Sequence, residues 1–271
     1  MKTTLFKFCI SGLAALPVLA QIAGAGSGVG SISLKHGAFI TEQDLPGEFA
    51  IVLGKLGGRM MSAGNARTTL AGTLTDDDGT RGVQITVQAP GYLRFQDSGS
   101  SARVLTFDGA QFGSRNGKGG SQDERIKESL LAHLPDMVLL QMAAGGGFRR
   151  IGGRFRTDDG RTPGYTGPYW TVYAYSPPVR KSMAWGQALQ QGMFVAIDEQ
   201  NGLLAEVRVV DSPPGGARNV IQTRFNNWFQ QSGQWYPGEI VRKENGKQVL
   251  KLVVQQAGTG PQSGASSDFE P

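Results

Sequence analysis

Residues 88–112 constrain the fold more than any other stretch, because they read as two short strands joined by a turn. Leu93 and Phe95 alternate with polar neighbours, which is the period of a strand with one buried face. Residues 97–101 are Asp-Ser-Gly-Ser-Ser, a composition typical of turns. The second strand ends at Asp108-Gly109, a dipeptide that favours a hairpin. The stretch therefore predicts antiparallel pairing.

The same unit of alternating strand and glycine turn repeats through most of the chain. Asn201-Gly202 and Asn245-Gly246 are further hairpin signals. The expected strands are residues 67–75, 82–88, 92–96, 103–107, 147–156, 169–175, 193–198, 203–210, 220–229, 235–242 and 247–256. The pattern predicts a mainly β protein with helices (α+β), built as one large antiparallel sheet wrapped on a helix.

The clearest helix is predicted over residues 122–144. Ser121 and Glu124 fit a capping box, and Pro135 should kink the helix. Its apolar face contains Ile126, Leu130, Leu134, Met137 and Val138. More than half of its circumference is apolar, so it needs cover on two sides. A core helix and a lid or plug inside a curved sheet both satisfy that need. A shorter helix is expected within residues 45–56.

The N-terminal residues 1–20 have the pattern of a cleaved secretory signal. Lys2 and Lys7 precede or begin an apolar run over residues 8–19, and Ala20 is a small residue that a signal peptidase accepts. A retained membrane anchor is the competing interpretation. Cys9 would leave with the signal, and the mature chain would then hold no disulfide and no thiolate metal site. We expect a flexible lead-in over 21–43, one domain over 44–256 and a disordered tail over 257–271.

Composition argues against several functional classes. Removal of Lys2 and Lys7 lowers the formal charge from +5 to +3, which is too weak and too dispersed to indicate nucleic-acid binding. His36 and His133 have no partners spaced for a metal site. The acidic turn at 76–78 is interpreted as solvated, since it lacks the later ligands of a calcium loop. No catalytic motif is found, so we expect neither an enzyme nor a cofactor; a hydrolase would need an acidic or Ser residue in its largest pocket.

Several motifs, in this order along the chain, resemble the periplasmic lipoprotein-carrier (LolA/LolB-like) superfamily. The first motif comprises Pro90, Gly91, Leu93, Arg94, Phe95, Asp108 and Gly109. A Leu-rich stretch at 130–135 that ends in proline follows, and then Gly-Gln-Trp-Tyr-Pro at 233–237. The likeness covers roughly residues 47–256.

The resemblance implies an incomplete antiparallel β-barrel, a half-barrel with a helix on or in its concave face. It implies a periplasmic monomer that binds acyl chains or lipoproteins in an apolar cavity. Extraction of lipid would be driven by burial of acyl CH₂ groups. The candidate ligand-binding residues are Tyr92, Arg94, Leu130, Leu134, Val138, Trp170 and Val172.

One departure from the superfamily pattern concerns the helical lid. Many carriers have an arginine before the motif proline that holds the lid, and here that residue is Ala89. Gln88 and Arg94 are the nearest polar candidates for this role. The same half-barrel also serves envelope regulators that bind a segment of a membrane protein, so an envelope regulator or protein-binding module is the alternative function.

Overall fold

The computed structural model describes residues 17–20, 32–35, 47–56, 66–88, 92–98, 102–107, 112–117, 120–143, 147–157, 163–176, 192–211, 216–261 and 269. Twelve strands form one antiparallel sheet in the order β7-β6-β5-β4-β3-β16-β15-β12-β11-β10-β9-β8. Nearly all neighbours in this order are also neighbours along the chain, as expected for a meander of hairpins. The exceptions are the pair β3–β16, which joins the two halves of the sheet, and the pair β12–β15, whose strands are separated in the chain by a small hairpin.

The longest pairing of the sheet lies in its middle, where all of β3 pairs with residues 250–261 of β16. The central strands are β3 (Ala66–Asp76), β16 (Lys247–Pro261), β15 (Glu239–Glu244) and β12 (Asn219–Asn226). One wing contains β4 (Gly79–Gln88), β5 (Tyr92–Asp97), β6 (Val104–Phe107) and β7 (Phe112–Arg115). The other contains β11 (Leu204–Asp211), β10 (Gly192–Asp198), β9 (Tyr169–Ser176) and β8 (Gly147–Arg156).

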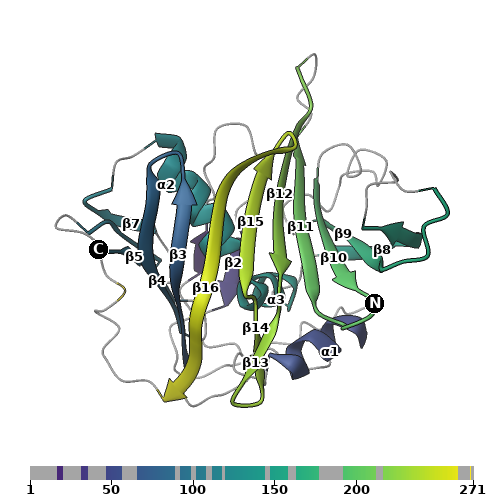
Figure 1. The fold of residues 1–271 in the computed structure, drawn as a ribbon, viewed down its shortest axis with the longest axis horizontal. Coiled ribbons are helices and arrows are strands. Elements are labelled where there is room, and N and C mark those ends of the chain that lie inside the picture. Colours follow the sequence, from purple (N-terminus) through teal and green to yellow (C-terminus); the bar gives the residue numbers. More distant parts are fainter. Residues whose placement is uncertain are drawn as a thin grey trace, which may run out of the picture.

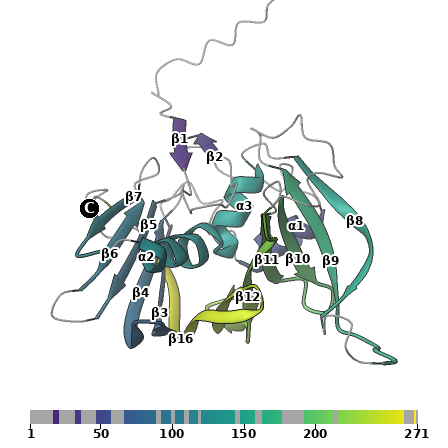
Figure 2. The same ribbon diagram turned by 90° about the horizontal axis from the view of Figure 1, so that it is seen from above.

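The sheet is open, and its two wings curve toward the same side (Figure 1, Figure 2). In the described part of the chain the outermost strands, β7 and β8, pair on one side only. Figure 2 shows the helical segment between them, in the hollow formed by the wings and the central strands. The predicted half-barrel with a helix in its concave face is confirmed.

The helix predicted over 122–144 is interrupted rather than merely kinked. It consists of α2 (Gly120–Ile126), a π-helical turn η2 (Lys127–Ala132) and α3 (Pro135–Ala143). The backbone N–H of His133 donates to the carbonyl of Glu128 at 2.8 Å, five residues back. Pro135 begins α3, where its missing N–H removes no helical hydrogen bond. We call residues 120–143 the inner helix.

Alternation along the strands separates an inner from an outer face. Leu93 and Phe95 of β5 are buried, with 1% and 0% exposure, and belong to the single core cluster beneath the inner helix. Arg94 lies between them on the outer face and is half-buried. Because directly paired residues face the same side of a sheet, their partners Ile85 and Val87 of β4 and Leu105 and Phe107 of β6 also face inward.

The end of the domain differs from the sequence expectation. β16 continues past residue 256 to Pro261, which lies opposite Ala66 of β3. The hydroxyl groups of Thr68 and Thr259 form a hydrogen bond of 2.9 Å across this extension. The expected disordered tail is therefore corrected for residues 257–261, and Phe269 is also buried.

Three smaller units accompany the main sheet. The expected short helix is α1 (Gly47–Lys55). A small hairpin, β13 (Phe229–Gln231) and β14 (Gln234–Tyr236), occupies the region where longer strands were expected. β1 (Pro17–Ala20) pairs with β2 (Ile32–Lys35) apart from the main sheet. β1 covers the last residues of the predicted signal, and the rest of residues 1–31 lies outside the described residues.

Candidate functional site

The candidate site is the concave face of the sheet together with the inner helix that fills it. Ile126, Leu130 and Val138 are fully buried and Leu134 is 1% exposed. These side chains form one apolar cluster with inward residues of both wings, among them Phe95, Leu105, Val195 and Val207. The inner helix therefore covers the apolar concave face of the sheet.

Helix α1 contributes to the same cluster at β9 and β10. Phe49, Val52 and Leu56 are fully buried. The ring of Phe49 meets the ring of Tyr173 edge-on, with centroids 4.8 Å apart. The ammonium group of Lys55 donates to the backbone carbonyl of Asn201.

Within this apolar interface, a buried arginine of β15 holds the π-helical turn. Arg242 is 3% exposed, and its Nη1 lies 2.6 Å from Oε2 of Glu128. The same nitrogen donates to the hydroxyl of Ser129 at 2.9 Å. Its Nε donates to Oε1 of Glu244 at 2.9 Å. A buried pair of this kind requires all its polar partners, because removal of one leaves a charge in an apolar environment.

His133 lies at the break of the inner helix, next to this ion pair. Its Nδ1 is 3.0 Å from the hydroxyl of Thr223, and its Nε2 is 4.0 Å from Oε1 of Glu128. Among the described residues, Nε2 of His133 and Oε1 of Glu128 have no hydrogen-bond partner. Burial, and to a lesser degree Arg242, lowers the pKa of His133 to about 3, so the ring is neutral near pH 7. Burial raises the pKa of Glu128, against the opposing attraction of Arg242.

A second set of ion pairs holds α2 against the β3–β4 turn. Arg103 contacts Asp123 of α2 and Asp78 of the turn, each at 2.9 Å. Arg125 of α2 reaches Asp77 of the turn and Glu244 of β15, each at 2.8 Å. The acidic turn predicted to be solvated therefore pairs with arginines. Its contacts connect the N-terminal part of the inner helix to the sheet.

The predicted ligand-binding residues lie on two different faces. Leu130, Leu134 and Val138 lie together in the concave interface. Tyr92 and Arg94 lie on the outer face of β5. Trp170 and Val172 also point outward, on the opposite side of β9 from the buried Thr171 and Tyr173. The residues from β5 and β9 are therefore not brought together with those of the helix.

The ring of Trp170 lies under the guanidinium of Arg224, 5.3 Å from its centroid. Arg224 in turn contacts Glu206 at 2.6 Å on the outer face. This surrounding is polar and charged, unlike that of an acyl-chain site.

Sequence reasoning missed the cluster formed by Arg242, Glu128 and His133. One signal was present: Arg242 lies two residues after Ile240, so both point to the same face of β15. A charged residue in phase with a buried apolar one indicates a buried polar contact. The polar candidates for holding a lid, Gln88 and Arg94, do not reach the inner helix from the outer face. Ala89 lies outside the described residues.

In the described part of the chain, no group of three or more His, Cys, Asp or Glu side chains is arranged to bind a metal ion. No described helix has the length and apolar character needed to span a membrane.

The chain resembles several solved structures, whereas no protein-family model and no curated protein matches its sequence. A LolA superfamily protein from Nitrosomonas europaea has a TM-score of 0.46 and 11% identity, covering 86% of this chain and 98% of that one. An outer-membrane lipoprotein-sorting protein domain from Vibrio parahaemolyticus has a TM-score of 0.42 and 11% identity, with coverages of 81% and 95%. The MucA/MucB complex of Pseudomonas aeruginosa gives a TM-score of 0.25 and 10% identity, with coverages of 83% and 61%.

The descriptions of the first two matches bear out the resemblance predicted from the sequence motifs. None of the three descriptions names an enzyme. At 10–11% identity the likeness concerns the fold alone. The chain is an open antiparallel half-barrel whose concave face is filled by an interrupted helix, and the structures that it resembles include LolA superfamily proteins.

Proposed function

We propose that this protein binds the acyl chains of lipids or lipoproteins in the concave face of its half-barrel, in the manner of a periplasmic carrier. One observation carries the proposal: an apolar helix, interrupted at its middle, is buried against the open sheet. The inner helix then acts as an internal substitute for the ligand. Binding requires that it move away from the sheet and expose the apolar surface beneath.

The free energy gained by burying an acyl chain is similar in size to the cost of exposing the inner helix, so the ligand can replace the helix. Burial of one saturated chain of ~16 carbons gains about 13 kcal/mol, at ~0.8 kcal/mol for each CH₂ group. Exposure of the six buried apolar side chains of the inner helix costs about 9–18 kcal/mol, at ~1.5–3 kcal/mol each. The six are Ile126, Leu130, Leu134, Met137, Val138 and Leu139. Burial of one acyl chain is therefore comparable in free energy to the apolar contacts of the inner helix, and the polar contacts of Arg242 bias the free protein toward the closed arrangement.

Lipid binding can be tested directly on the purified protein. Native mass spectrometry of protein isolated from its own envelope should show adducts of lipid mass, and the apo protein should take up a fluorescent fatty acid. Val207→Asp should abolish uptake because it places a carboxylate on the apolar sheet surface that the acyl chain would contact. Val253→Asp is the matched control, since Val253 is 40% exposed. A clean apo mass without fatty-acid uptake would contradict the proposal.

Hydrogen exchange separates a defect in binding from a defect in folding. If lipid displaces the inner helix, the amides of η2 and α3 should exchange faster in the lipid-bound protein, while those of β15 and β16 remain protected. The measurement uses the unaltered chain and does not depend on the stability of Val207→Asp. Unchanged exchange in η2 at saturating lipid would refute the displacement model.

The alternative is a protein-binding module in which the same face accepts an amphipathic helix from a membrane protein. The observation favouring it is that the concave face already contains a helix, so its shape suits helix-in-groove recognition. Pull-down from envelope extracts would then return one stoichiometric partner that fatty acid does not displace. Competition by fatty acid would instead favour the carrier function.

The periplasmic location and the monomeric state belong to the same proposal. Cleavage after Ala20 would remove β1 and leave β2 without its partner, but would leave the main sheet intact. Intact-mass measurement of protein from the periplasmic fraction identifies the mature N-terminus. Recovery of the uncleaved chain in the inner membrane would favour a retained anchor.

A further inference from the structure

Two polar residues lie side by side on the apolar concave face of the sheet. Thr223 of β12 is directly opposite Arg242 of β15, and both are buried, with 0% and 3% exposure. The partners on either side of this pair are Val207 of β11 and Leu250 of β16, which belong to the apolar core. Because directly paired residues face the same side of a sheet, all four side chains face the inner helix. The proposed acyl-chain surface therefore contains one hydroxyl and one guanidinium.

The middle of the inner helix supplies contacts to both of these polar residues. Nη1 of Arg242 meets the carboxylate of Glu128 at 2.6 Å and donates to the hydroxyl of Ser129 at 2.9 Å. The hydroxyl of Thr223 is 3.4 Å from that of Ser129 and 3.0 Å from Nδ1 of His133. When the middle of the helix moves away from the sheet, Arg242 and Thr223 lose these contacts together.

The N-terminal part of the inner helix has its own attachment to the sheet. Asp123 of α2 meets Arg103 at 2.9 Å, and each side chain is 4% exposed. Arg125 of α2 meets Glu244 of β15 at 2.8 Å. The regular α-helix ends after these residues, where η2 begins at Lys127. We therefore take the segment that moves to begin at η2, with α2 kept in place by its ion pairs.

Movement of η2 removes negative charge from Arg242. In the closed arrangement two carboxylates contact its guanidinium, that of Glu128 at Nη1 and that of Glu244 at Nε. The first leaves with η2, and the second remains but is shared with Arg125. A buried charge that loses its partner is strongly destabilising. An occupant made of hydrocarbon alone would leave this cost in place, whereas a carboxylate restores both the charge and the hydrogen bonds.

The closed arrangement is not fully hydrogen-bonded, which favours its exchange for a ligand. Oε1 of Glu128 and Nε2 of His133 are buried 4.0 Å apart and have no hydrogen-bond partner among the described residues. A buried polar atom without a partner destabilises the state that contains it. Once η2 moves away from the sheet, both atoms can bond to water. The helix is therefore an incompletely bonded occupant of the polar site, which a ligand carboxylate can replace.

We propose that Arg242 and Thr223 form the head-group site for the acyl ligand and select a fatty acid over a neutral chain of the same length. The inference rests on the proposed binding in the concave face and deepens it by naming the class of ligand. The carboxylate of the fatty acid takes the place of Glu128 at Nη1 of Arg242. The hydroxyl of Thr223 donates a further hydrogen bond, and the hydrocarbon chain lies on the neighbouring apolar side chains.

The test compares palmitate with methyl palmitate and hexadecyl alcohol near pH 7, each measured by its displacement of a fluorescent alkyl alcohol. The variant is Arg242→Met combined with Glu128→Gln, which removes both charges and leaves neither one unpaired. The affinity ratio of palmitate to alcohol should be at least tenfold higher for the unaltered protein than for this double variant. The ratio cancels differences in solubility between the ligands. Methyl palmitate should bind the two proteins equally.

A matched control removes an equivalent ion pair from the other side of the same strands. Nζ of Lys251 lies 2.6 Å from Oε2 of Glu239. Each residue is adjacent in sequence to an inward core residue, so both point to the outer face. Lys251→Met combined with Glu239→Gln makes the same change in charge as the double variant. It should leave the preference for palmitate unchanged.

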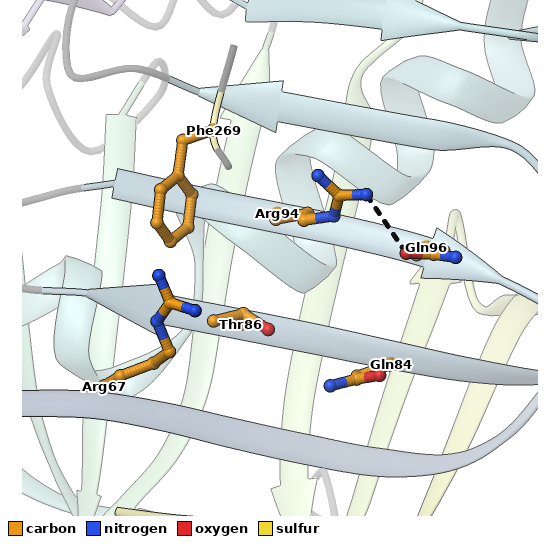
Figure 3. Close-up of a pocket in the computed structure, with 6 residues that line it drawn as sticks. All are labelled: Arg67, Gln84, Thr86, Arg94, Gln96 and Phe269. Atoms are coloured by element: carbon orange, nitrogen blue, oxygen red, sulfur yellow. Dashed lines mark hydrogen bonds between the residues drawn. The ribbon is translucent and has the colours of Figure 1, made fainter. Parts of the chain in front are cut away.

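A cleft on the outer face offers a second place with arginine side chains. It has a volume of about 220 Å³, and Arg67, Arg94 and Gln96 are among its lining residues (Figure 3). Arg94→Gln removes one of its guanidinium groups and leaves the concave face unaltered. The preference for palmitate should persist in this variant, because Arg94 lies on the opposite side of β5 from the core.

Failure of this inference and failure of the proposed function give different results. If none of the three chains binds, the proposed function fails and the head-group site fails with it. If the unaltered protein and the double variant give the same ratio of palmitate to alcohol, acyl binding stands and the head-group site is wrong. Equal dependence of methyl palmitate and palmitate on Arg242 would overturn the selection of a fatty acid. Loss of the preference in Arg94→Gln would place the carboxylate on the outer face and overturn the site.

A measurement on the unaltered chain keeps the inference testable if the double variant does not fold. Carbon-13 NMR of carboxyl-labelled palmitate reports whether the bound head group is ionised. Contact with Arg242 should keep the carboxylate ionised at about pH 6, since a nearby positive charge favours the charged form. A bound carboxyl group that is protonated at this pH would lie in an apolar environment away from Arg242, and the head-group site would be refuted.

Discussion

His133 should make the stability of this protein strongly dependent on pH below neutrality. The ring is 1% exposed, and its Nδ1 lies 3.0 Å from the hydroxyl of Thr223. Burial lowers its pKa from 6.5 to about 3. Between these values the unfolded chain binds a proton that the folded chain does not, so stability is lost as the pH falls below 6.5.

The size of this loss follows from the same two pKa values. Each pH unit below 6.5 costs about 1.4 kcal/mol until the folded-state pKa is approached. At pH 5 the loss is about 2 kcal/mol, and near pH 3 it reaches about 4 kcal/mol. A domain with a total stability of ~5–15 kcal/mol would be measurably weakened at pH 5.

Glu128 titrates beside His133, so a matched variant is needed to separate their contributions to the pH dependence of stability. Burial raises the pKa of Glu128, so this residue has the opposite effect: the folded protein binds its proton at higher pH than the unfolded chain and is stabilised as the pH falls. His133→Asn removes only the histidine titration and retains an amide that can bond to Thr223.

The assay is urea unfolding at pH 7, 6 and 5, followed by circular dichroism. The free energy of unfolding of the unaltered protein, minus that of His133→Asn, should decrease by about 2 kcal/mol from pH 7 to pH 5. A difference that stays constant within about 0.3 kcal/mol would refute the reasoning. It would mean that the folded protein protonates His133 near its ordinary pKa, with the imidazolium paired to Glu128.

Two further predictions concern the contacts that hold the sheet and the inner helix. Arg242→Met should lower the free energy of urea unfolding by about 3–5 kcal/mol because Glu128 is left as a buried unpaired charge. Adding Glu128→Gln should recover most of that loss, and a double variant as unstable as Arg242→Met would contradict the explanation. Gly72→Ala should destabilise the protein by about 1–3 kcal/mol, since its Cβ would lie 2.0 Å from the carbonyl oxygen of Val253. Gly54→Ala in α1 is the control: open space surrounds it, so its thermal midpoint should be unchanged or higher.

The sequence by itself determined the local elements. Alternation of apolar and polar residues predicted β5 almost to the residue, and the Asn-Gly dipeptides predicted the turns before β11 and β16. Helical periodicity identified the inner helix, and its excess of apolar surface indicated cover on two sides. These features depend on residues within a few positions of one another, which a sequence displays directly.

The tertiary structure decided which face of each strand is inward. Alternation placed Leu93 and Phe95 on one face and Tyr92 and Arg94 on the other, but both faces of β5 carry aromatic residues. Only the curvature of the sheet and the position of the inner helix assign the first pair to the core. The predicted site consequently combined residues from the two sides of the sheet.

Pairing between residues far apart in the chain likewise could not be predicted from sequence patterns. The extension of β16 to Pro261 depends on β3, whose paired residues are far earlier in the chain. Arg242 becomes a buried contact only because β15 passes beneath the π-helical turn that contains Glu128. Periodicity reports which side chains share a face. Which distant side chain lies opposite a buried charge depends on strand order, register and curvature, and these exist only once the sheet has formed.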